Sequence, residues 1–337
     1  MLNFDEARFL RIQSGALALG PGIDEAVGSC LAKGAANLFF LGTGGAAILM
    51  QPAAQLLQRR SAFPTYLEIA AELVAGGHAA LGPRSIVVIP SLSGTTAESV
   101  AALELARAKG AAIIVLTGHA DTPLGRMADH CLVNFAEDDT SSESFYLQSL
   151  LLALALMRRR GELPDHAGLV TGFASLPALL LDVKRSFEPR AAELAGRIAT
   201  EPYHIITAAG ACWPQAFYYG MCILEEMQWI RTRPVHAADF FHGTLELVEP
   251  GVSVILLKGE DACRSLADRV ERFAARYTDK LFVLDTASFD LPGISPSARA
   301  LLSPAVLATA LERLSAHLEA KRNHPLTTRR YYKKVDY

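Results

Sequence analysis

The sequence lacks the segments that mark membrane and secreted proteins. Its longest apolar run, Leu150 to Met157, is far shorter than the roughly 20 residues with which a helix crosses a bilayer. The N-terminus, MLNFDEARFL, contains acidic residues and no basic n-region, so no secretory signal is visible. We therefore expect a cytoplasmic protein that does not interact with a membrane.

The sequence also lacks the spacings that mark metal sites and disulfide frameworks. Its nine histidines include no H-E-x-x-H motif and no pair four residues apart. The five cysteines are scattered along the chain, without paired spacing, at Cys30, Cys131, Cys212, Cys222 and Cys263. Such cysteines are typical of reduced core residues. We expect no disulfide, no metal and no cofactor.

A strong excess of positive charge is missing as well. The net charge of −3 argues against a protein that binds nucleic acids in general. The hydrophobic fraction of 51% is enough for large cores, and 337 residues suggest two domains or one large α/β unit.

Neither of the common nucleotide-binding loops is present. No segment has the pattern G-x-x-x-x-G-K-[ST]. The turn Gly42–Gly45 follows an apolar run, but it is not G-x-G-x-x-G, and no acidic residue closes a second strand at the expected place. A glycine cluster of this kind is weak evidence for a dinucleotide site.

What is present is an alternation of apolar runs and helical patterns, which predicts parallel sheets covered on both faces. In the first half, the predicted strands are Asn37–Leu41, Ser85–Ile89, Ala112–Thr117 and Cys131–Phe135, and the predicted helices are Gly45–Arg59, Leu67–Ala75, Ala97–Lys109 and Ser141–Arg160. In the second half, the predicted strands are His204–Ala208, Val252–Leu257 and Leu281–Asp285. The predicted helices there are Leu176–Arg197, with a break at Pro189, then Pro214–Ile230, Cys263–Arg276 and Ser303–Lys321. We place the two domains at residues 1–162 and 163–322, with a basic tail at 323–337.

The loop Ser91–Thr96 is the most informative local feature. It follows the apolar strand SIVVIP and opens a helix, so its four hydroxyls and one glycine lie where backbone N–H groups are unpaired and the helix dipole is positive. This predicts a site for the phosphate of a small metabolite, such as a sugar phosphate. The alternative is that serine and threonine are simply good capping and turn residues, although one cap needs only one hydroxyl.

The two halves follow one plan. Each opens with a strand, a glycine-containing turn and a helix, and the turns are Gly42–Gly45 and Ala209–Ala211. The position of the Ser91–Thr96 loop is taken in the second half by Lys258-Gly259-Glu260-Asp261, which is acidic and would repel a phosphate. Only the first half is therefore expected to keep an anion site, at the carboxyl ends of its strands.

At this point the motifs resemble a known family. The strand–GTGG–helix unit, the segment LEIAAE and the loop PSLSGTTAES resemble the sugar isomerase (SIS) domain. The segments AGACWPQ and FHGTLE of the second half are similar to a second SIS domain, as found in the isomerase half of glucosamine-6-phosphate synthase. The resemblance covers nearly the whole chain and is greatest to the fructosamine 6-phosphate deglycases. It implies two tandem SIS domains, each a flavodoxin-like three-layer α/β/α sandwich with a parallel sheet.

The resemblance also implies the catalytic residues. It makes Glu226 the base that moves a proton between C1 and C2 of the sugar, and His242 the second acid–base group. Glu225 and Glu226 are adjacent on a predicted helix and diverge by about 100°, so at most one can face the site, and the residues alone do not choose between them. His236 competes with His242, which the motif favours. The resemblance further implies that the His242 loop reaches into a neighbouring subunit of a homodimer or higher homo-oligomer.

The expected substrate contacts come from both halves. Ser91, Ser93 and Thr96 should hold the phosphate, and Thr43 with Gly44 should close over the sugar. By resemblance, Ser141 is a sugar-binding serine and Lys333 a tail lysine near the active site. Alternatively, Ser141 is simply the N-cap of a helix, and the tail is a frayed basic terminus without a role in the site.

The expected function is cleavage of a 6-phosphorylated Amadori compound to glucose 6-phosphate and a free amine. The alternatives are a phosphosugar or amino-sugar phosphate isomerase or deaminase on the same scaffold, and a sensor that binds sugar phosphates without catalysis. The sequence does not reveal which amine the substrate carries.

Overall fold

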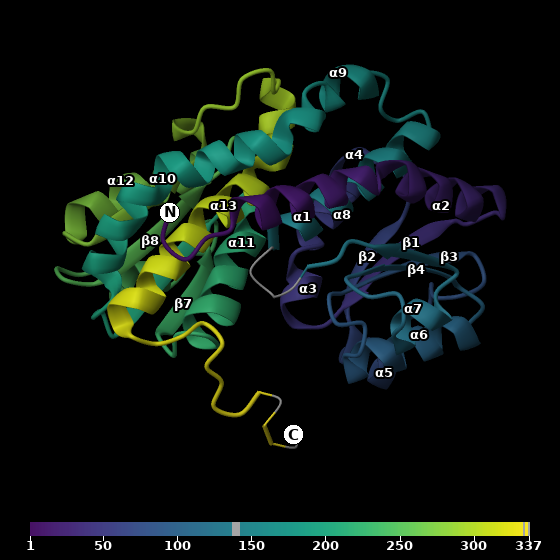
Figure 1. Cartoon of the computed structure of the whole chain (residues 1–337), viewed down its shortest axis with the longest axis horizontal. Coiled ribbons are helices and arrows are strands. Elements are labelled where there is room, and N and C mark those ends of the chain that lie inside the picture. Colours follow the sequence, from purple (N-terminus) through teal and green to yellow (C-terminus); the bar gives the residue numbers. More distant parts are fainter. Residues whose placement is uncertain (137–141, 333, 336–337) are drawn as a thin grey trace. The chain divides into compact units, whose positions relative to one another are not determined.

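The computed structural model describes residues 1–136, 142–332 and 334–335, which form two compact units (Figure 1). The N-terminal unit consists of Ala7–Pro177 and Gly293–Ala298. The C-terminal unit consists of Met1–Glu6, Ala178–Pro292 and Arg299–Tyr337, so it includes the tail. The chain changes units at Pro177, whereas the sequence suggested a boundary after residue 162.

The N-terminal unit is built on a five-stranded parallel sheet in the order β2-β1-β3-β4-β5. Its strands are β1 (Asn37–Gly42), β2 (Thr65–Ile69), β3 (Ser85–Ser91), β4 (Ala112–Thr117) and β5 (His130–Val133). Its helices are α1 (Glu6–Ala18), α2 (Gly20–Ala32), α3 (Gly44–Ile48), α4 (Gln51–Arg60), α5 (Ala70–Gly76), α6 (Ala97–Ala108), α7 (Pro123–Met127), α8 (Ser142–Arg159), α9 (His166–Val170) and the 3-10 turn η1 (Phe173–Ser175). One face of the sheet packs on α5, α6 and α7 around a core that includes Phe39, Val87 and Leu103.

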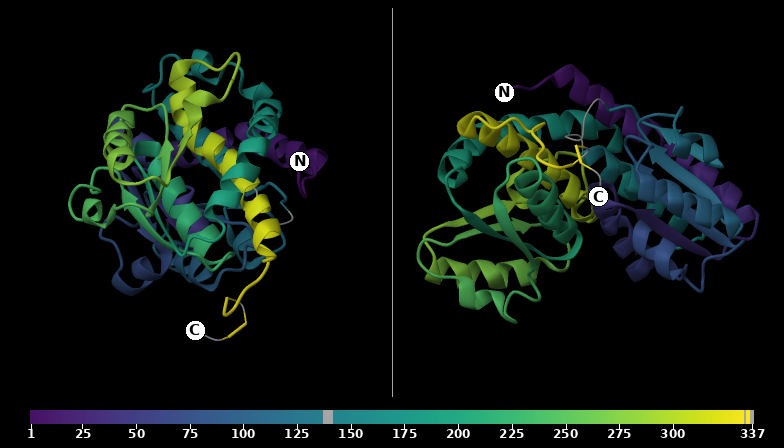
Figure 2. Two further views of the ribbon diagram at one scale, coloured as in Figure 1. Left: turned by 90° about the vertical axis from the view of Figure 1, so that its left-hand side faces the viewer. Right: turned by 90° about the horizontal axis from the view of Figure 1, so that it is seen from below.

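The C-terminal unit is built on a four-stranded parallel sheet in the order β7-β6-β8-β9. Its strands are β6 (Tyr203–Ala208), β7 (Arg231–His236), β8 (Ser253–Lys258) and β9 (Leu281–Asp285). Its helices are α10 (Leu176–Ile198), α11 (Trp213–Tyr218), the π-helix η3 (Tyr219–Glu225), α12 (Arg264–Tyr277), α13 (Pro296–Arg322) and the 3-10 turns η2 (Gly210–Cys212), η4 (Thr244–Leu247) and η5 (Thr286–Ser288). In the right-hand view of Figure 2, α12 lies on one side of this sheet, and α10 and α13 lie on the other.

The two sheets share one strand order, which confirms the internal repeat. β7-β6-β8-β9 corresponds strand for strand to β2-β1-β3-β4, and among the described residues β5 is the one strand of the N-terminal sheet without a counterpart. An order in which the first strand lies between the second and third is that of flavodoxin-like sheets. The predicted fold class, two tandem parallel α/β sandwiches, is therefore confirmed.

Two strands were missed in the sequence. β2 occupies part of the predicted helix Leu67–Ala75, and β7 occupies a stretch that was left without a predicted element. Both are edge strands with one neighbour each, and their side chains are mostly half-buried or exposed. An edge strand of this kind lacks the continuous apolar run that identifies a strand buried on both faces.

The predicted helices also need correction. The predicted helix Pro214–Ile230 is α11 followed by the π-helix η3, and it ends at Glu225. α10 continues through Pro189 without the predicted break, and α1 and α2 precede the first strand without having been predicted. By length and composition, residues 166–198 form a helical stretch that could span a membrane. This is weak evidence, since core helices pass the same test and 44% of the 18-residue apolar window within it is buried.

Candidate active site

The loop after β3 forms a tight turn at the N-terminus of α6. Ser91 is buried at the end of β3, and its hydroxyl accepts the Gly94 N–H at 3.1 Å. Gly94 has a φ of +65°, and a Cβ there would lie 2.2 Å from Thr122 Oγ1. Only glycine fits this position, because any side chain would be strained and would clash. The turn therefore brings Ser91 to within 3.5 Å of the Thr96 hydroxyl, at the start of α6.

Two hydroxyls of this loop, those of Ser91 and Ser93, accept backbone N–H groups within the turn, as the capping and turn alternative requires, but the Thr96 side chain does not cap α6. Thr96 is the N-cap residue of α6 but makes no side-chain hydrogen bond to the first turn of the helix. Ser93 bonds instead within the loop, accepting the Thr95 N–H at 3.3 Å and the Thr95 hydroxyl at 3.1 Å. The N-terminus of a twelve-residue helix therefore has no side-chain acceptor from its own cap residue, an arrangement suited to an anion.

The first turn of the N-terminal unit offers a second polar group. Thr43 is the N-cap residue of α3 and makes no capping bond, and its hydroxyl is buried without a partner among the described residues. The next residue, Gly44, has a φ of +55°, and the space where its Cβ would stand is open for 4 Å. A buried hydroxyl without a partner beside open space is a group that a bound ligand would satisfy.

In the C-terminal unit, the equivalent space is filled from within the protein. Gly210 follows β6 as Gly44 follows β1 and has almost the same backbone angle, a φ of +57°. A Cβ there would lie 2.3 Å from Asp261 Oδ2. That carboxylate accepts the Ala211 N–H at 2.7 Å and the Cys263 N–H at 2.8 Å. An internal carboxylate thus occupies the place that would otherwise suit an anion.

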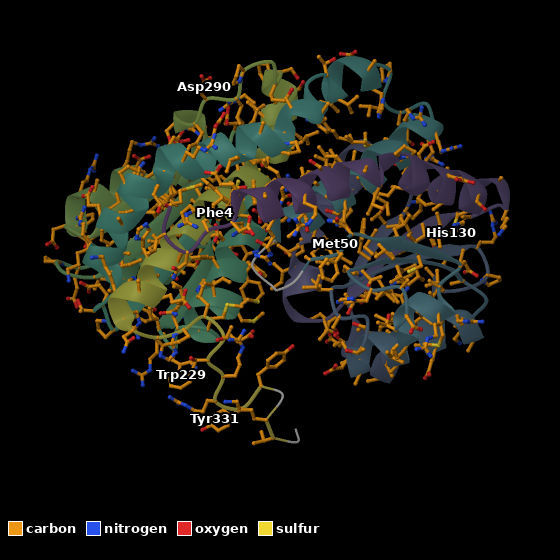
Figure 3. All side chains as sticks on the ribbon, viewed as in Figure 1. Phe4, Met50, His130, Trp229, Asp290 and Tyr331 are labelled. Atoms are coloured by element: carbon orange, nitrogen blue, oxygen red, sulfur yellow. The ribbon has the colours of Figure 1, made fainter. Side chains whose placement is uncertain are left out.

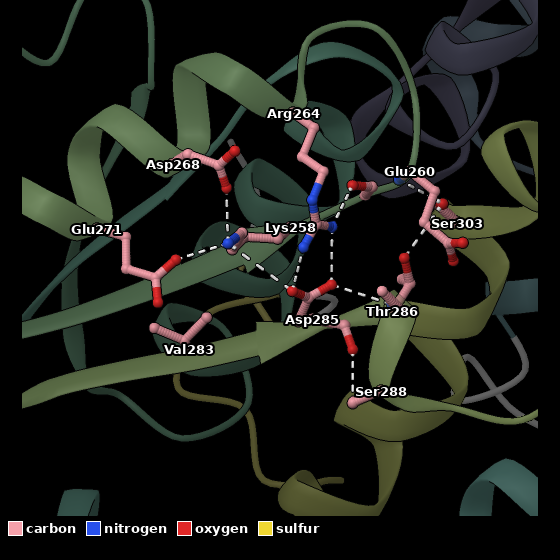
Figure 4. A network of polar contacts seen from close by, with 12 residues as sticks. Lys258, Glu260, Arg264, Asp268, Glu271, Val283, Asp285, Thr286, Ser288 and Ser303 are labelled. Atoms are coloured by element: carbon pink, nitrogen blue, oxygen red, sulfur yellow. Dashed lines mark hydrogen bonds and ion pairs between the residues drawn. The ribbon is translucent and has the colours of Figure 1, made fainter.

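The remaining charges at this end of the C-terminal sheet pair with one another (Figure 4). Lys258, at the end of β8, lies 2.7 Å from Asp268, 2.6 Å from Glu271 and 3.7 Å from Asp285. Arg299 binds Glu260 through two nitrogens, at 2.7 and 2.9 Å. The acidic loop is therefore neutralised by structural ion pairs.

Glu225 and Glu226 lie where the π-helix η3 ends, before β7. Glu225 is exposed, and its Oε1 accepts the hydroxyl of Thr232 at 2.5 Å. Glu226 is half-buried, with 33% of its side chain exposed, and its Oε1 lies 2.8 Å from Nε of Arg329. π-Helical turns are rare and are found frequently at functional sites. Both carboxylates line one cavity of about 610 Å³.

The C-terminal tail forms the other wall of that cavity. Arg330 stacks on Trp229, with its guanidinium carbon 4.2 Å from the ring centroid. The tail is tied down by a hydrogen bond from Gln228 Nε2 to the carbonyl of His324, at 2.8 Å, and by the Arg329–Glu226 pair. Figure 3 labels Trp229 and Tyr331 close together where the tail leaves α13. These contacts therefore tie the tail to the fold as far as Arg330, and beyond it Tyr331, Tyr332 and Val335 are exposed.

The candidate histidines lie at the other end of β7. His242 is exposed in a turn after the strand, and it does not line the cavity that contains Glu226. His236 ends the strand and contacts the ring of Trp213 edge-on, at 5.5 Å. The six residues of β7 separate its two ends by roughly 16 Å. Within one chain, Glu226 and His242 therefore do not line the same cavity.

Two predicted site residues, Ser141 and Lys333, lie outside the described residues. No group of three or more His, Cys, Asp or Glu side chains that could hold a metal occurs in the part of the chain that the structure describes. The sequence analysis missed Trp229, Arg329 and Arg330 as site residues. The Arg-Arg-Tyr-Tyr segment of the tail was the available signal, because exposed arginines beside aromatics are common in binding sites.

Comparison with known proteins agrees with this architecture. A family model described as "SIS domain" matches residues 32–158. The curated protein "Fructosamine deglycase FrlB" of Bacillus subtilis (strain 168) is 31% identical over 303 residues, which are 89% of this chain and 92% of that protein. The chain belongs to the SIS-domain family. "Fructoselysine 6-phosphate deglycase" of Escherichia coli (strain K12) is a further relative of this SIS-domain protein, with 28% identity over 88% of the chain and 85% of the relative.

Solved structures extend the likeness to the whole fold. A crystal structure from Salmonella typhimurium LT2, provisionally named a phosphosugar isomerase, matches with a TM-score of 0.89 and 30% identity, over 94% of this SIS-domain protein and 97% of that chain. The C-terminal domain of glucosamine-fructose-6-phosphate aminotransferase from Francisella tularensis matches with a TM-score of 0.80 at 14% identity, over 95% and 94%. The second likeness is one of fold alone.

Proposed function

We propose that the protein is a deglycase that cleaves a 6-phosphorylated Amadori compound, such as fructoselysine 6-phosphate, into glucose 6-phosphate and a free amine or amino acid. The observation that carries the proposal is the 31% identity to a fructosamine deglycase over 92% of that protein. The site supports it, because the N-terminal unit keeps an open anion loop while Asp261 fills the equivalent place in the C-terminal unit.

The proposed reaction is a proton shuttle followed by hydrolysis. Glu226 takes a proton from C1 of the amino-ketose and gives an enaminol, with a double bond between C1 and C2. Return of that proton to C2 gives an imine of glucose 6-phosphate. Water then adds to C1, the C1–N bond breaks, and the amine leaves with a proton from solvent. In this proposal His242 transfers protons to and from O2 and the ring oxygen.

The substrate contacts follow from the same proposal. Ser91, Ser93 and Thr96 hold the 6-phosphate at the N-terminus of α6, where backbone N–H groups and the helix dipole favour an anion. Thr43 and Gly44 lie along the sugar. Ser141 and Lys333 keep the roles that the family resemblance implies. A phosphorylated metabolite and five free cysteines are in keeping with a cytoplasmic enzyme.

We also propose that the enzyme is a homodimer or larger assembly in which one subunit supplies His242 to the site of another. The support is geometric, because Glu226 and His242 lie near opposite ends of β7 and His242 is exposed. A histidine that cannot meet the base within its own chain can meet it across a symmetric interface.

The direct test is incubation with fructoselysine 6-phosphate and measurement of glucose 6-phosphate by a coupled assay. We expect product from the wild-type protein and a loss of at least about 1,000-fold in kcat for Glu226→Gln and His242→Asn, with sugar-phosphate binding retained. Conversion of fructose 6-phosphate or glucosamine 6-phosphate, with no release of lysine, would favour an isomerase or deaminase. Binding without any turnover would favour a sensor.

The shared site is tested by mixing the two inactive variants. If His242 acts across subunits, each mixed dimer contains one intact site, and random mixing should restore about a quarter of the wild-type activity. If both residues act within one chain, no activity returns. Sedimentation of the mixture establishes that mixed dimers have formed.

A further inference from the structure

The cavity beside Glu226 is lined by charged side chains that the proposed proton transfer does not use. Its volume, about 610 Å³, suits a small ligand. Its lining carries three arginines (Arg231, Arg329 and Arg330) against two glutamates (Glu225 and Glu226), so the cavity has an excess of positive charge.

Two of these arginines are available to an anion. Arg329 is engaged by Glu226 at 2.8 Å. Among the described residues, neither Arg231 nor Arg330 makes an ion pair, although both line the cavity. A guanidinium presents a planar fork of donors that matches a carboxylate, so these two side chains form a suitable site for one.

Trp229 holds the side chain of Arg330 in position. The indole ring lies 4.2 Å from the guanidinium carbon of Arg330 and is met edge-on by His324, at 4.6 Å. Trp229 adopts a φ of +55°, a conformation that costs a bulky residue on the order of 1 kcal/mol. It is also 41% exposed, although it is large and apolar. Strain and exposure together at a cavity wall are typical of a binding residue rather than of a packing residue.

We propose that this cavity receives the amine part of the substrate and that Arg330 and Arg231 bind a carboxylate on it. The inference rests on the proposed function, because Glu226 on the cavity wall then acts at C1, the carbon that bears the amine. It goes beyond the proposed function by naming the residues that distinguish an amine with a carboxylate from one without it. Trp229 positions Arg330 to recognise that carboxylate.

The test compares two substrates that differ only in the carboxylate, namely fructoselysine 6-phosphate and the matching derivative of cadaverine. For the wild-type enzyme we expect kcat/KM to be about 10- to 100-fold higher for the lysine derivative, as suits a charge-assisted hydrogen bond. Arg330→Gln and Arg231→Gln should each reduce this preference, and the double variant should bring it close to unity. Turnover of the cadaverine derivative should change little.

Arg197→Gln is the matched control. Arg197 is also exposed and also stacks on an aromatic ring, lying 4.7 Å from the centroid of Phe282, but it does not line the cavity. This variant should keep the full preference for the lysine derivative. Equal kcat/KM values for the two substrates in the wild-type enzyme would overturn the proposal, and so would an unchanged preference in the double variant.

A binding experiment separates this inference from the proposed function. Lysine and cadaverine are titrated in the presence of glucose 6-phosphate, and Trp229 fluorescence is followed in a Trp213→Phe background, which leaves Trp229 as the only tryptophan. Lysine should bind, cadaverine should bind at least about 10-fold more weakly, and Arg330→Gln should remove the difference. Absence of turnover together with this difference would reject the deglycase but keep the carboxylate site. No difference would reject the site.

Discussion

At the scale of single residues, the contrast between Gly44 and Gly210 distinguishes the two halves of the repeated fold. The two glycines have nearly the same φ, and both follow the first strand of their sheet. What differs is the neighbour, which is open space at Gly44 and the Asp261 carboxylate at Gly210. A single internal carboxylate is enough to satisfy the backbone donor there and to exclude a phosphate by charge.

Thr43 provides the test at this scale. Its buried hydroxyl has no partner among the described residues, so Thr43→Val should leave the free energy of unfolding unchanged or raise it by up to about 1 kcal/mol. If that hydroxyl contacts the sugar, KM for the sugar phosphate should rise about 10-fold. Thermal melts with and without glucose 6-phosphate measure the stability and the ligand-induced shift in Tm, and steady-state kinetics measure KM.

Thr309→Val is the control for this substitution. The buried hydroxyl of Thr309 donates to the Ala305 carbonyl at 2.8 Å, so its loss should cost stability by about 1 kcal/mol without affecting the ligand-induced shift in Tm. A Thr43→Val protein that loses stability in the same way, and keeps its ligand shift, would assign the Thr43 hydroxyl to the fold.

At the scale of elements, the return path of one helix determines where the base lies. α11 and η3 start after the carboxyl end of β6 and run back, so Glu225 and Glu226 emerge beside the first residues of β7. The turn that carries His242 follows the last residue of the same strand. The loop after β3 lies at the carboxyl end of its strand, where the switch-point rule places ligands, whereas Glu226 lies beside the first residues of β7.

The ion-pair cluster at the end of β8 is a second feature at this scale (Figure 4). Burial of Lys258 alone would lower its pKa, but hydrogen bonds to Asp268 and Glu271 outweigh burial and raise it. Because the pKa is raised, the stabilisation is complete below the ordinary lysine pKa and is lost only in strong base.

Lys258→Met should therefore destabilise the protein at neutral pH, by roughly 2 kcal/mol, because it leaves neighbouring carboxylates without their cation. Urea unfolding at neutral pH measures this. Arg126→Met, which breaks the exposed pair with Asp121, should cost less than about 0.5 kcal/mol. Equal costs for the two variants would show that the Lys258 cluster contributes no more than a surface pair.

At the scale of the whole molecule, stability should fall as the solution becomes acidic. Burial lowers the pKa of His204 to about 4, and its Nδ1 lies 2.6 Å from the hydroxyl of Ser253. The unfolded chain takes up this proton near pH 6.5, before the folded protein does, so acid favours unfolding. Between about pH 6.5 and pH 4 the free energy of unfolding should fall by roughly 3 kcal/mol from this group. His204→Asn should flatten the dependence of the free energy of unfolding on pH in that range. If the variant and the wild-type protein show the same slope, the decline does not come from His204.

A second decline in the free energy of unfolding is expected at lower pH. Burial alone would raise the pKa of Glu188, but hydrogen bonds from Arg313 and from the Leu2 N–H outweigh it and lower the pKa to about 2. Its stabilising effect is present above pH 4.5 and is lost as the pH falls toward 2. Glu188→Gln should remove this decline, which chemical unfolding followed by circular dichroism between pH 5 and pH 2 would detect.

Much of the architecture could be read from residue patterns because it depends on local chemistry. β1, β3, β4, β6 and β8 are buried along nearly their whole length and appear as continuous apolar runs, and the half-buried edge strand β9 is also almost entirely apolar, so all six were predicted within one or two residues. β2 and β7 could not be found in this way, because these two edge strands mix polar with apolar residues. The π-helix η3 has no sequence signature that separates it from an α-helix.

The sequence by itself determined the tandem parallel α/β plan, the loop Ser91–Thr96 and the candidate pair Glu226 and His242. Each of these depends on neighbouring residues or on a motif. Only the tertiary structure decided that Asp261 lies beside Gly210, and that Arg329 and Arg330 line one cavity with Glu226. The physical reason is the same in each case: these contacts join segments far apart in the chain, and only packing brings such segments together.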